Sequence, residues 1–314
     1  MIAWVLGRGG LLGNSVEKQL VRSCQIWAPK PTFLWGDESA FEEQIDQAVE
    51  QYVENVGMER WSILWCAGIG VVSSSSDLLD GEVQKIEYLL ERLSKCPSQF
   101  LRQGSLFYAS SAGGVYAGSQ FPPFTELTEP IPVGLYGQHK LHCENLFIEF
   151  TRKFQTPSVI GRIANLYGPS QNRSKGQGFI TAMCSAMISR KPIQIYVPLE
   201  TIRNFIYIDD AASIITDQII NVSYQNLDGV LIKVIASDRN ISLGEVVGET
   251  ARVFGRRPQV VLTQTEEGKL HLMDLRLKSI IHTDIALQTS TSLAIGMDRI
   301  RHHLLSELQS ANLA

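Results

Sequence analysis

The sequence predicts an α/β protein built on a doubly wound parallel sheet, with a second, smaller lobe. Three observations lead to this class. Short apolar runs alternate with amphipathic helical patterns through the first two-thirds of the chain. A glycine cluster at 7–13 separates the first apolar run from the first helical pattern. After Tyr167 a polar, turn-rich stretch begins. Strands that alternate with helices are typical of parallel sheets.

Each element of the first part follows from the spacing of its apolar residues. Short apolar runs indicate strands, whereas apolar residues three and four apart indicate helices. The expected strands are Ile2–Leu6, Gln25–Trp27, Thr32–Trp35, Ser62–Ala67, Leu106–Ser110 and Ser158–Ala164. The expected helices are Leu11–Val21, Phe41–Asn55, Val83–Leu93 and Leu135–Phe154.

The second part of the chain carries fewer and smaller elements. Gly168 to Gly178 is expected to form a loop over the site. The helices expected there are Phe179–Ser189, Ala211–Ile219 with Asp209 and Asp210 as its N-cap, Leu243–Phe254 and Ser292–Leu308. We expect one domain over 1–167, to which 204–237 return, and a smaller lobe formed by 168–203 and 238–314.

Composition excludes several classes of protein. Hydrophobic residues make up 44% of the 314 residues and charged residues 19%, which is ordinary for a globular enzyme. The net charge is −4 and the basic residues are scattered, so no nucleic-acid partner is expected. No apolar run has the length of a membrane span, and we read no signal peptide. Five cysteines without a CxxC pair favour a reducing cytoplasm, and the six histidines show no ligand spacing, so no metal site is expected.

The pair Tyr136 and Lys140 is the strongest chemical signal. The two residues are four apart in a helical pattern, so their side chains lie one turn apart on the same face. A phenol has a reference pKa of about 10, and bringing it to about 7 takes roughly 4 kcal/mol of phenolate stabilisation. A fixed cation beside the phenol supplies such stabilisation. The pair therefore indicates an acid/base group.

The glycine cluster indicates a dinucleotide site. Gly7, Gly10 and Gly13 are three apart at a strand-to-helix junction. Such a loop turns tightly and lets backbone N–H groups and the helix N-terminus approach a pyrophosphate. The residues expected to line the pyrophosphate are Gly7, Arg8, Gly10, Leu11, Leu12 and Gly13.

The expected dinucleotide is NADP, with NAD as the alternative. A NAD site of this kind usually has an acidic residue about 20 residues beyond the loop. None stands between Glu17 and Asp37, whereas Arg8 and Lys30 are positioned for a 2′-phosphate.

Further segments, in this order and spacing, resemble the extended short-chain dehydrogenase/reductase family, also called the NAD-dependent epimerase/dehydratase family. The resemblance covers nearly the whole chain. It is carried by the glycine loop, Gly36-Asp37, Ala67-Gly68, Ser110-Ser111-Ala112-Gly113-Gly114-Val115-Tyr116, Thr125-Glu126, Tyr136-Gly137-Gln138-His139-Lys140, the run Arg162 to Pro169 and the run Arg203 to Asp210. It departs from the family in lacking the acidic residue after the second strand and in having one more residue before Val115.

The resemblance implies a Rossmann-type domain and a lobe that binds a nucleotide sugar. It implies that Asp37 contacts the adenine and that Ala67 and Gly68 pass near the cofactor ribose and phosphates. Lys140 would also bind the nicotinamide ribose. The catalytic set implied is Tyr136, Lys140 and either Ser110 or Ser111, of which we favour Ser111. Asn165 and Arg203 are implied to face the nucleotide part of the substrate.

Hydride transfer at a sugar carbon is the chemistry expected from these groups. Tyr136 would exchange a proton with a substrate hydroxyl, and Ser111 would hydrogen-bond the substrate oxygen. The expected function is a nucleotide-sugar epimerase or reductase. The alternatives are a reductase of a non-sugar carbonyl and a non-catalytic, cofactor-binding regulator. A homodimer is expected through apolar stripes on Val83–Leu93 and Leu135–Phe154, because relatives pair through the matching helices.

Overall fold

The computed structural model describes residues 1–30, 32–68, 75–171, 178–224, 229–263, 273–281 and 290–313. The chain divides into two compact units. The first consists of Met1–Val115, Pro132–Arg162 and Ala212–Lys233. The second consists of Tyr116–Ile131, Ile163–Ala211 and Val234–Ala314. Within the described residues, no helix is long and apolar enough to cross a membrane.

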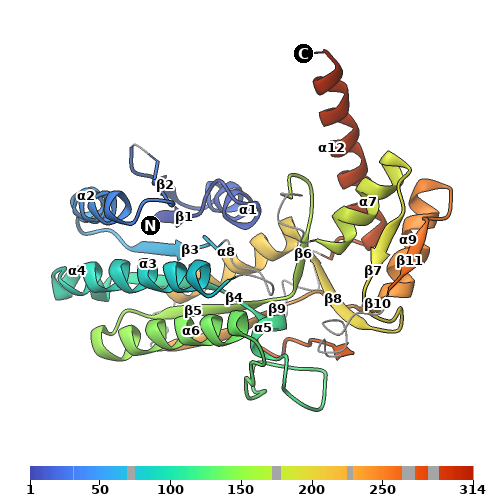
Figure 1. The fold of residues 1–314 in the computed structure, drawn as a ribbon. Helices are drawn as coiled ribbons and strands as arrows, with labels where there is room; N and C mark the ends of the chain where they lie inside the picture. Colours follow the sequence, from blue (N-terminus) through green and yellow to red (C-terminus); the bar gives the residue numbers. More distant parts are fainter. Residues whose placement is uncertain are drawn as a thin grey trace. The chain divides into compact units, whose positions relative to one another are not determined.

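A six-stranded sheet forms the centre of the first unit (Figure 1). Its strand order is β2-β1-β3-β4-β5-β9, and β1 pairs in parallel with both β2 and β3. The strands are β1 Ile2–Leu6, β2 Gln25–Trp27, β3 Trp61–Trp65, β4 Gly104–Ser111, β5 Ser158–Ile163 and β9 Val230–Ile235. The order runs outward in both directions from β1 and β3, which is the doubly wound arrangement that the sequence predicts.

Helices cover this sheet because each turns an apolar face toward it. On one face, alternate strand residues such as Trp4, Ile63 and Tyr108 pack in a single core cluster with α2, α3 and α6. The intervening strand residues, such as Val5 and Phe107, are also buried, as expected for a sheet covered on both faces. The helices are α1 Leu11–Leu20, α2 Glu38–Val56, α3 Ser76–Ser94, α4 Ser98–Arg102, α5 Ala112–Val115, α6 Leu135–Phe154 and α8 Ile208–Tyr224.

The strand expected at Thr32–Trp35 does not form. The backbone N–H of Leu34 donates to the side chain of Gln44, and the N–H of Asp37 donates to the carbonyl of Leu34 in a turn. The ring of Phe33 packs against that of Trp4 in β1, but residues 32–35 are not assigned to any strand. Aromatic residues are typical of strands, but here the apolar side chains anchor a loop that leads into α2.

In its described residues, the second unit contains shorter strands and three helices of its own. A four-stranded sheet has the order β10-β8-β12, and β6 also pairs with β8; a separate pair joins β11 to β7. The strands are β6 Asn165–Tyr167, β7 Ile193–Ile195, β8 Ile202–Tyr207, β10 Asn240–Ser242, β11 Val260–Leu262 and β12 Asp274–Leu275. The helices are α7 Phe179–Ser189, α9 Leu243–Phe254 and α12 Leu293–Leu313.

The N-cap expected at Asp209 and Asp210 is wrong. Helix α8 begins earlier, at Ile208, so both carboxylates lie in its first turn. Asp210 accepts hydrogen bonds from the backbone N–H and the hydroxyl of Thr291, at 2.7 and 2.9 Å. Asp210 therefore anchors the segment that leads into α12. Of the loop expected over the site, 172–177 lie outside the described residues.

Candidate active site

Tyr136 and Lys140 lie one turn apart near the start of α6. The side chain of Lys140 is only 8% exposed, whereas Tyr136 is half-buried. The ammonium nitrogen Nζ of Lys140 lies 5.9 Å from the ring centroid of Tyr136 and 5.3 Å from that of Tyr108. The structure thus places a buried cation beside the candidate acid/base phenol.

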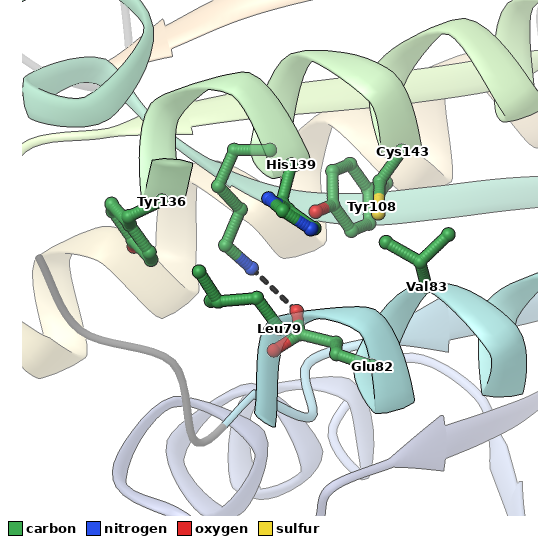
Figure 2. Close-up of a pocket in the computed structure, with 8 residues that line it drawn as sticks. Leu79, Glu82, Val83, Tyr108, Tyr136, His139 and Cys143 are labelled. Carbon is green, nitrogen blue, oxygen red and sulfur yellow. Dashed lines mark hydrogen bonds and ion pairs between the residues drawn. The ribbon is translucent and has the colours of Figure 1, made fainter. Parts of the chain in front are cut away.

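A carboxylate that the sequence analysis did not single out pairs with this lysine. Oε1 of Glu82, on α3, accepts a hydrogen bond from Nζ of Lys140 at 2.7 Å, and the dashed line in Figure 2 marks this ion pair. Burial is the largest single influence on Lys140 and lowers its pKa, but the charge and hydrogen bond of Glu82, together with the neighbouring Tyr136 and Cys143, outweigh burial, so the pKa of the lysine is raised. The lysine is therefore held in its charged form.

These groups line a small pocket between α3 and α6. Tyr108 and Cys143 form part of its wall, and burial raises the pKa of both, that of Cys143 to about 11. Both groups therefore stay protonated at neutral pH. His139, at the pocket's rim, bonds to Asp80 at 2.7 Å, and this bond raises the pKa of the imidazole. No group of three metal-ligating side chains occurs in the described ranges.

The two adjacent serines have different surroundings. Ser110 is buried and donates to Oε1 of Glu144 at 2.5 Å. Glu144 is in turn held by the guanidinium of Arg162, with both side chains almost fully buried. Ser111 is half-buried, and its hydroxyl oxygen accepts from the backbone N–H of Gly114 at 3.2 Å. The hydroxyl of Ser110 thus bonds to a buried ion pair, while that of Ser111, among the described residues, bonds only within a short turn.

Glycines bring the serine segment against α6. A Cβ at Gly114 would lie 3.0 Å from Cε1 of Tyr136. A Cβ at Gly137 would lie 2.2 Å from the carbonyl oxygen of Gly114, closer than any real contact. Because neither glycine carries a side chain, the turn that contains Ser111 packs directly on the turn that carries Tyr136. The structure therefore brings three of the expected catalytic residues, Ser111, Tyr136 and Lys140, into one neighbourhood.

The glycine loop forms a tight turn at the carboxyl end of β1. Gly7 has a φ of 87°, and a Cβ there would lie 2.5 Å from the backbone nitrogen of Ala67. A Cβ at Gly13 would lie 2.3 Å from the carbonyl oxygen of Gly7. Gly10 is the N-cap of α1 and offers no side-chain cap, whereas a Cβ at Gly9 would meet nothing within 4 Å. The first turn of α1 thus has no side-chain cap, and the space beside Gly9 in the preceding loop is open.

The other expected cofactor residues lie in the same unit. Ala67 and Gly68 follow β3 after one intervening residue, Cys66, and a Cβ at Gly68 would lie 3.6 Å from Nζ of Lys140. The carboxylate of Asp37 accepts from the N–H of Ala40 at 3.0 Å and caps α2. Arg8 pairs with Glu17 of α1 at 2.7 Å and remains about half exposed.

Asn165 and Arg203, the expected substrate residues, belong to the second unit. They lie on the neighbouring strands β6 and β8. The amide of Asn165 donates to the carbonyl of Asn204 at 2.8 Å. Burial lowers the pKa of Arg203 to about 10, so its guanidinium is charged at neutral pH. An exposed amide and a partly buried cation can recognise a phosphate or a base.

Glu82 and Glu144 are the residues that sequence reasoning missed. A signal for both exists in the sequence. Glu82 lies on the apolar face of α3 with Leu79 and Ile86, and Glu144 lies on the apolar face of α6 with Phe147. A charged residue on an apolar stripe needs a partner inside the fold. The expected helix began only at Val83, which left Glu82 outside the pattern.

The chain is similar over part of its length to four curated proteins. It is 33% identical over 98 residues to dTDP-L-rhamnose 4-epimerase of Burkholderia thailandensis, covering 31% of this chain and 27% of that protein. In the four curated relatives the matched stretch covers between 18% and 54% of the protein.

Solved structures share the whole fold. UDP-glucose 4-epimerase of Thermotoga maritima, solved with UDP-glucose, has a TM-score of 0.78 and 17% identity, over 98% of this chain and 100% of that one. UDP-glucose 4-epimerase of Thermus thermophilus, solved with NAD, has a TM-score of 0.75 and 18% identity, over 97% and 99%.

The family model of the NAD-dependent epimerase/dehydratase family matches residues 44–221, more than half of the 314-residue chain. This stretch includes the serine segment, Tyr136 and Lys140. The resemblance stated from the sequence is confirmed, and so is the Rossmann-type fold that it implies. The chain belongs to the NAD-dependent epimerase/dehydratase family.

Proposed function

We propose that this chain is an NAD(P)-dependent enzyme that transfers hydride at a carbon of a nucleotide sugar, as an epimerase or a reductase. The observation that carries the proposal is the half-buried phenol of Tyr136 beside the buried cation Lys140, packed against the turn that holds Ser111. The named relatives support it, since one acts on a dTDP-sugar and a structural neighbour was solved with UDP-glucose.

The residues present fit a dinucleotide. The uncapped start of α1, the tight turn at Gly7 and the open space at Gly9 suit a pyrophosphate, which takes hydrogen bonds from backbone N–H groups. The residues that would hold it are Gly7, Arg8, Gly10, Leu11, Leu12 and Gly13, with Ala67 and Gly68 alongside and Asp37 toward the adenine. When bound, the dinucleotide accepts or supplies the hydride.

The chain's own residues supply positioning and proton transfer. Tyr136 takes a proton from the substrate hydroxyl during oxidation and returns one during reduction. Lys140 holds a buried positive charge beside this phenol. Ser111 donates a hydrogen bond to the substrate oxygen on which charge develops. Asn165 and Arg203 are proposed to bind the nucleotide part of the substrate.

For the dinucleotide we propose NADP ahead of NAD. Strand β2 ends at Trp27 and is followed by Ala28, so no carboxylate stands at the end of this strand to bind a 2′-hydroxyl. Arg8, in the loop, can exchange its contact with Glu17 for a 2′-phosphate. The comparison of dissociation constants for NADPH and NADH decides the matter, and tighter binding of NADH would overturn the preference.

The reaction is tested with the purified protein, each dinucleotide and a panel of UDP- and dTDP-sugars. Absorbance at 340 nm reports net oxidation or reduction, and NMR of the recovered sugar reports a changed stereocentre. We expect one sugar to react. Reaction with simple ketones alone would identify a non-sugar reductase. Binding of the dinucleotide without any turnover across the panel would identify a regulator.

We also propose a cytoplasmic homodimer. All five cysteines are free thiols, which suits a reducing compartment. The apolar stripes of α3 and α6 are buried in the chain's own core, so a dimer would use their outward faces, where Leu78 and Leu135 are exposed. Sedimentation at micromolar concentration tests the dimer, and a monomer there would contradict it.

A further inference from the structure

The mechanism described above leaves one buried carboxylate of the candidate site without a role. The side chain of Glu82 is only 9% exposed and lies on α3, opposite Lys140 of α6. Burying a carboxylate is costly unless partners replace its lost water. One oxygen, Oε1, has such a partner in the ammonium of Lys140 at 2.7 Å.

The second oxygen has no such partner among the residues that the structure describes. Oε2 of Glu82 is buried and accepts no hydrogen bond within the described part of the chain. An ionised carboxylate has about four acceptor positions, and buried polar atoms are nearly always satisfied. An acceptor that is shielded from bulk water and left open is a place where a ligand's donor can bind.

The position of this oxygen indicates which ligand. A Cβ at Gly68 would lie 3.4 Å from both carboxylate oxygens of Glu82 and 3.6 Å from Nζ of Lys140. Gly68 follows β3 at the carboxyl edge of the sheet, beside the turn at Gly7 that packs on Ala67. In doubly wound sheets this edge, at the switch point of the strand order, is where dinucleotides bind.

Charge narrows the choice of ligand group. A phosphate beside Glu82 would meet a carboxylate, so an anionic group is disfavoured there. A vicinal diol fits, because one hydroxyl can accept from the ammonium of Lys140 while the other donates to Oε2. The ribose that adjoins the nicotinamide is the diol of a dinucleotide that reaches the neighbourhood of Tyr136.

We propose that Glu82 is a binding and positioning residue that holds Lys140 with Oε1 and receives a hydroxyl of the nicotinamide-side ribose with Oε2. The inference rests on the proposed function in one respect, that a dinucleotide binds in this unit. It adds a specific consequence. The nicotinamide-side ribose, the second ribose of the dinucleotide, contributes part of the affinity, and this contribution depends on Glu82.

The test compares ADP-ribose, which has the second ribose, with ADP, which lacks it. Calorimetry gives the dissociation constants, with the 2′-phosphorylated forms used if NADP is preferred. For the unaltered protein we expect ADP-ribose to bind about tenfold or more tightly than ADP, the size of a hydrogen bond to a charged group. Glu82→Gln should lose most of this ratio, because a carboxamide presents its nitrogen to one of the two donors.

Glu87→Gln is the matched control. Glu87 lies on the same helix and faces His142 of α6 at 3.7 Å, but its side chain is 49% exposed. This variant should keep the ratio. If Glu82→Gln does not fold, Glu82→Asp keeps the charge and withdraws the oxygens by one methylene, and it should also reduce the ratio.

The outcomes separate the two proposals. An unchanged ratio in a folded Glu82 variant would overturn the inference and leave the proposed function standing. Equal affinity for ADP and ADP-ribose, in an unaltered protein that is shown separately to bind NAD or NADP, would also overturn the inference and leave the proposed function standing. An unaltered protein that binds neither dinucleotide would overturn both. Loss of the ratio in the Glu82 variants alone would support the inference.

Discussion

Two neighbouring serines show how one residue's position decides its chemistry. The sequence left open whether Ser110 or Ser111 would act, because the segment has one residue more than its relatives. At the end of a strand, successive side chains point to opposite faces. Ser110 points inward to Glu144, whereas Ser111 lies in the turn that packs on Tyr136. This geometry supports Ser111 as the proposed substrate-binding hydroxyl.

The two serines should therefore respond oppositely to substitution. Ser110→Ala removes a hydrogen bond to a buried carboxylate and should lower the free energy of unfolding by about 1–3 kcal/mol, with turnover per folded molecule largely kept. Ser111→Ala should leave the unfolding midpoint nearly unchanged and lower kcat by about 10²–10³. Denaturant titration and steady-state kinetics on both variants provide the measurements. The reverse pattern would assign the catalytic role to Ser110.

Tyr136→Phe isolates proton transfer. It removes one oxygen from a half-buried ring and leaves the packing against Gly114 intact. We expect kcat to fall by about 10²–10⁴, the usual contribution of a general acid or base. Dinucleotide affinity and the circular dichroism spectrum should stay close to those of the unaltered protein. Turnover within a few-fold of the unaltered enzyme would show that another group moves the proton.

Helices and strands with regular apolar spacing were predictable from the sequence. The structure confirms Ile2–Leu6, Gln25–Trp27 and Leu135–Phe154 with the same bounds. The prediction failed where side chains pack without regular backbone pairing, as at Thr32–Trp35. It also failed at the start of α3, where Leu79 is the single buried apolar residue before Val83 and stands among polar neighbours. Glu82 was missed for this reason, since spacing reveals a buried face but not the ion pairs formed across it.

Contact between α5 and α6 depends on glycine, and this contact can be tested. Gly137→Ala would place a methyl 2.2 Å from the carbonyl oxygen of Gly114, so α6 must shift with Tyr136 and Lys140. We expect a loss of about 1–3 kcal/mol in the free energy of unfolding and a loss of turnover that exceeds the loss of dinucleotide affinity. Gly113→Ala is the control, because a Cβ there meets nothing within 4 Å. Equal effects of both substitutions would contradict this account.

The two units of the chain differ in how much the sequence reveals about them. The first contains the motifs whose chemistry depends on short-range geometry, the glycine turn and the Tyr136 helix, and these were recognisable. In the second, Arg203 is recognisable as a candidate only through resemblance, because its burial depends on strands from distant parts of the sequence, β10 and β12. Substrate choice depends on such long-range contacts, so the sequence did not identify the sugar.

The pH dependence of the protein's free energy of unfolding should reflect the ion pair between Glu82 of α3 and Lys140 of α6. An unfolded chain releases a lysine proton near pH 10.4. In the fold, burial would lower the pKa of Lys140, but Glu82 and the neighbouring Tyr136 and Cys143 together outweigh it and the pKa is raised. A raised folded pKa means that the stabilisation is fully present below about pH 10 and is lost as the pH rises through the folded value.

Glu82→Gln reverses this dependence. Removing the carboxylate leaves burial as the main influence on Lys140, so its pKa should fall below that of the unfolded chain. At pH 7 we expect the variant to be less stable by about 3–5 kcal/mol, the usual cost of an unpaired buried charge. The difference should shrink as the pH approaches 10, because the variant's lysine then loses its proton in the fold. Urea titrations of both proteins between pH 7 and 10 give the two curves. A constant difference in the free energy of unfolding across this range would show that the substitution disturbs packing and not the charge pair. Glu87→Gln is the control and should show almost no difference, because the partner of Glu87 is exposed to solvent.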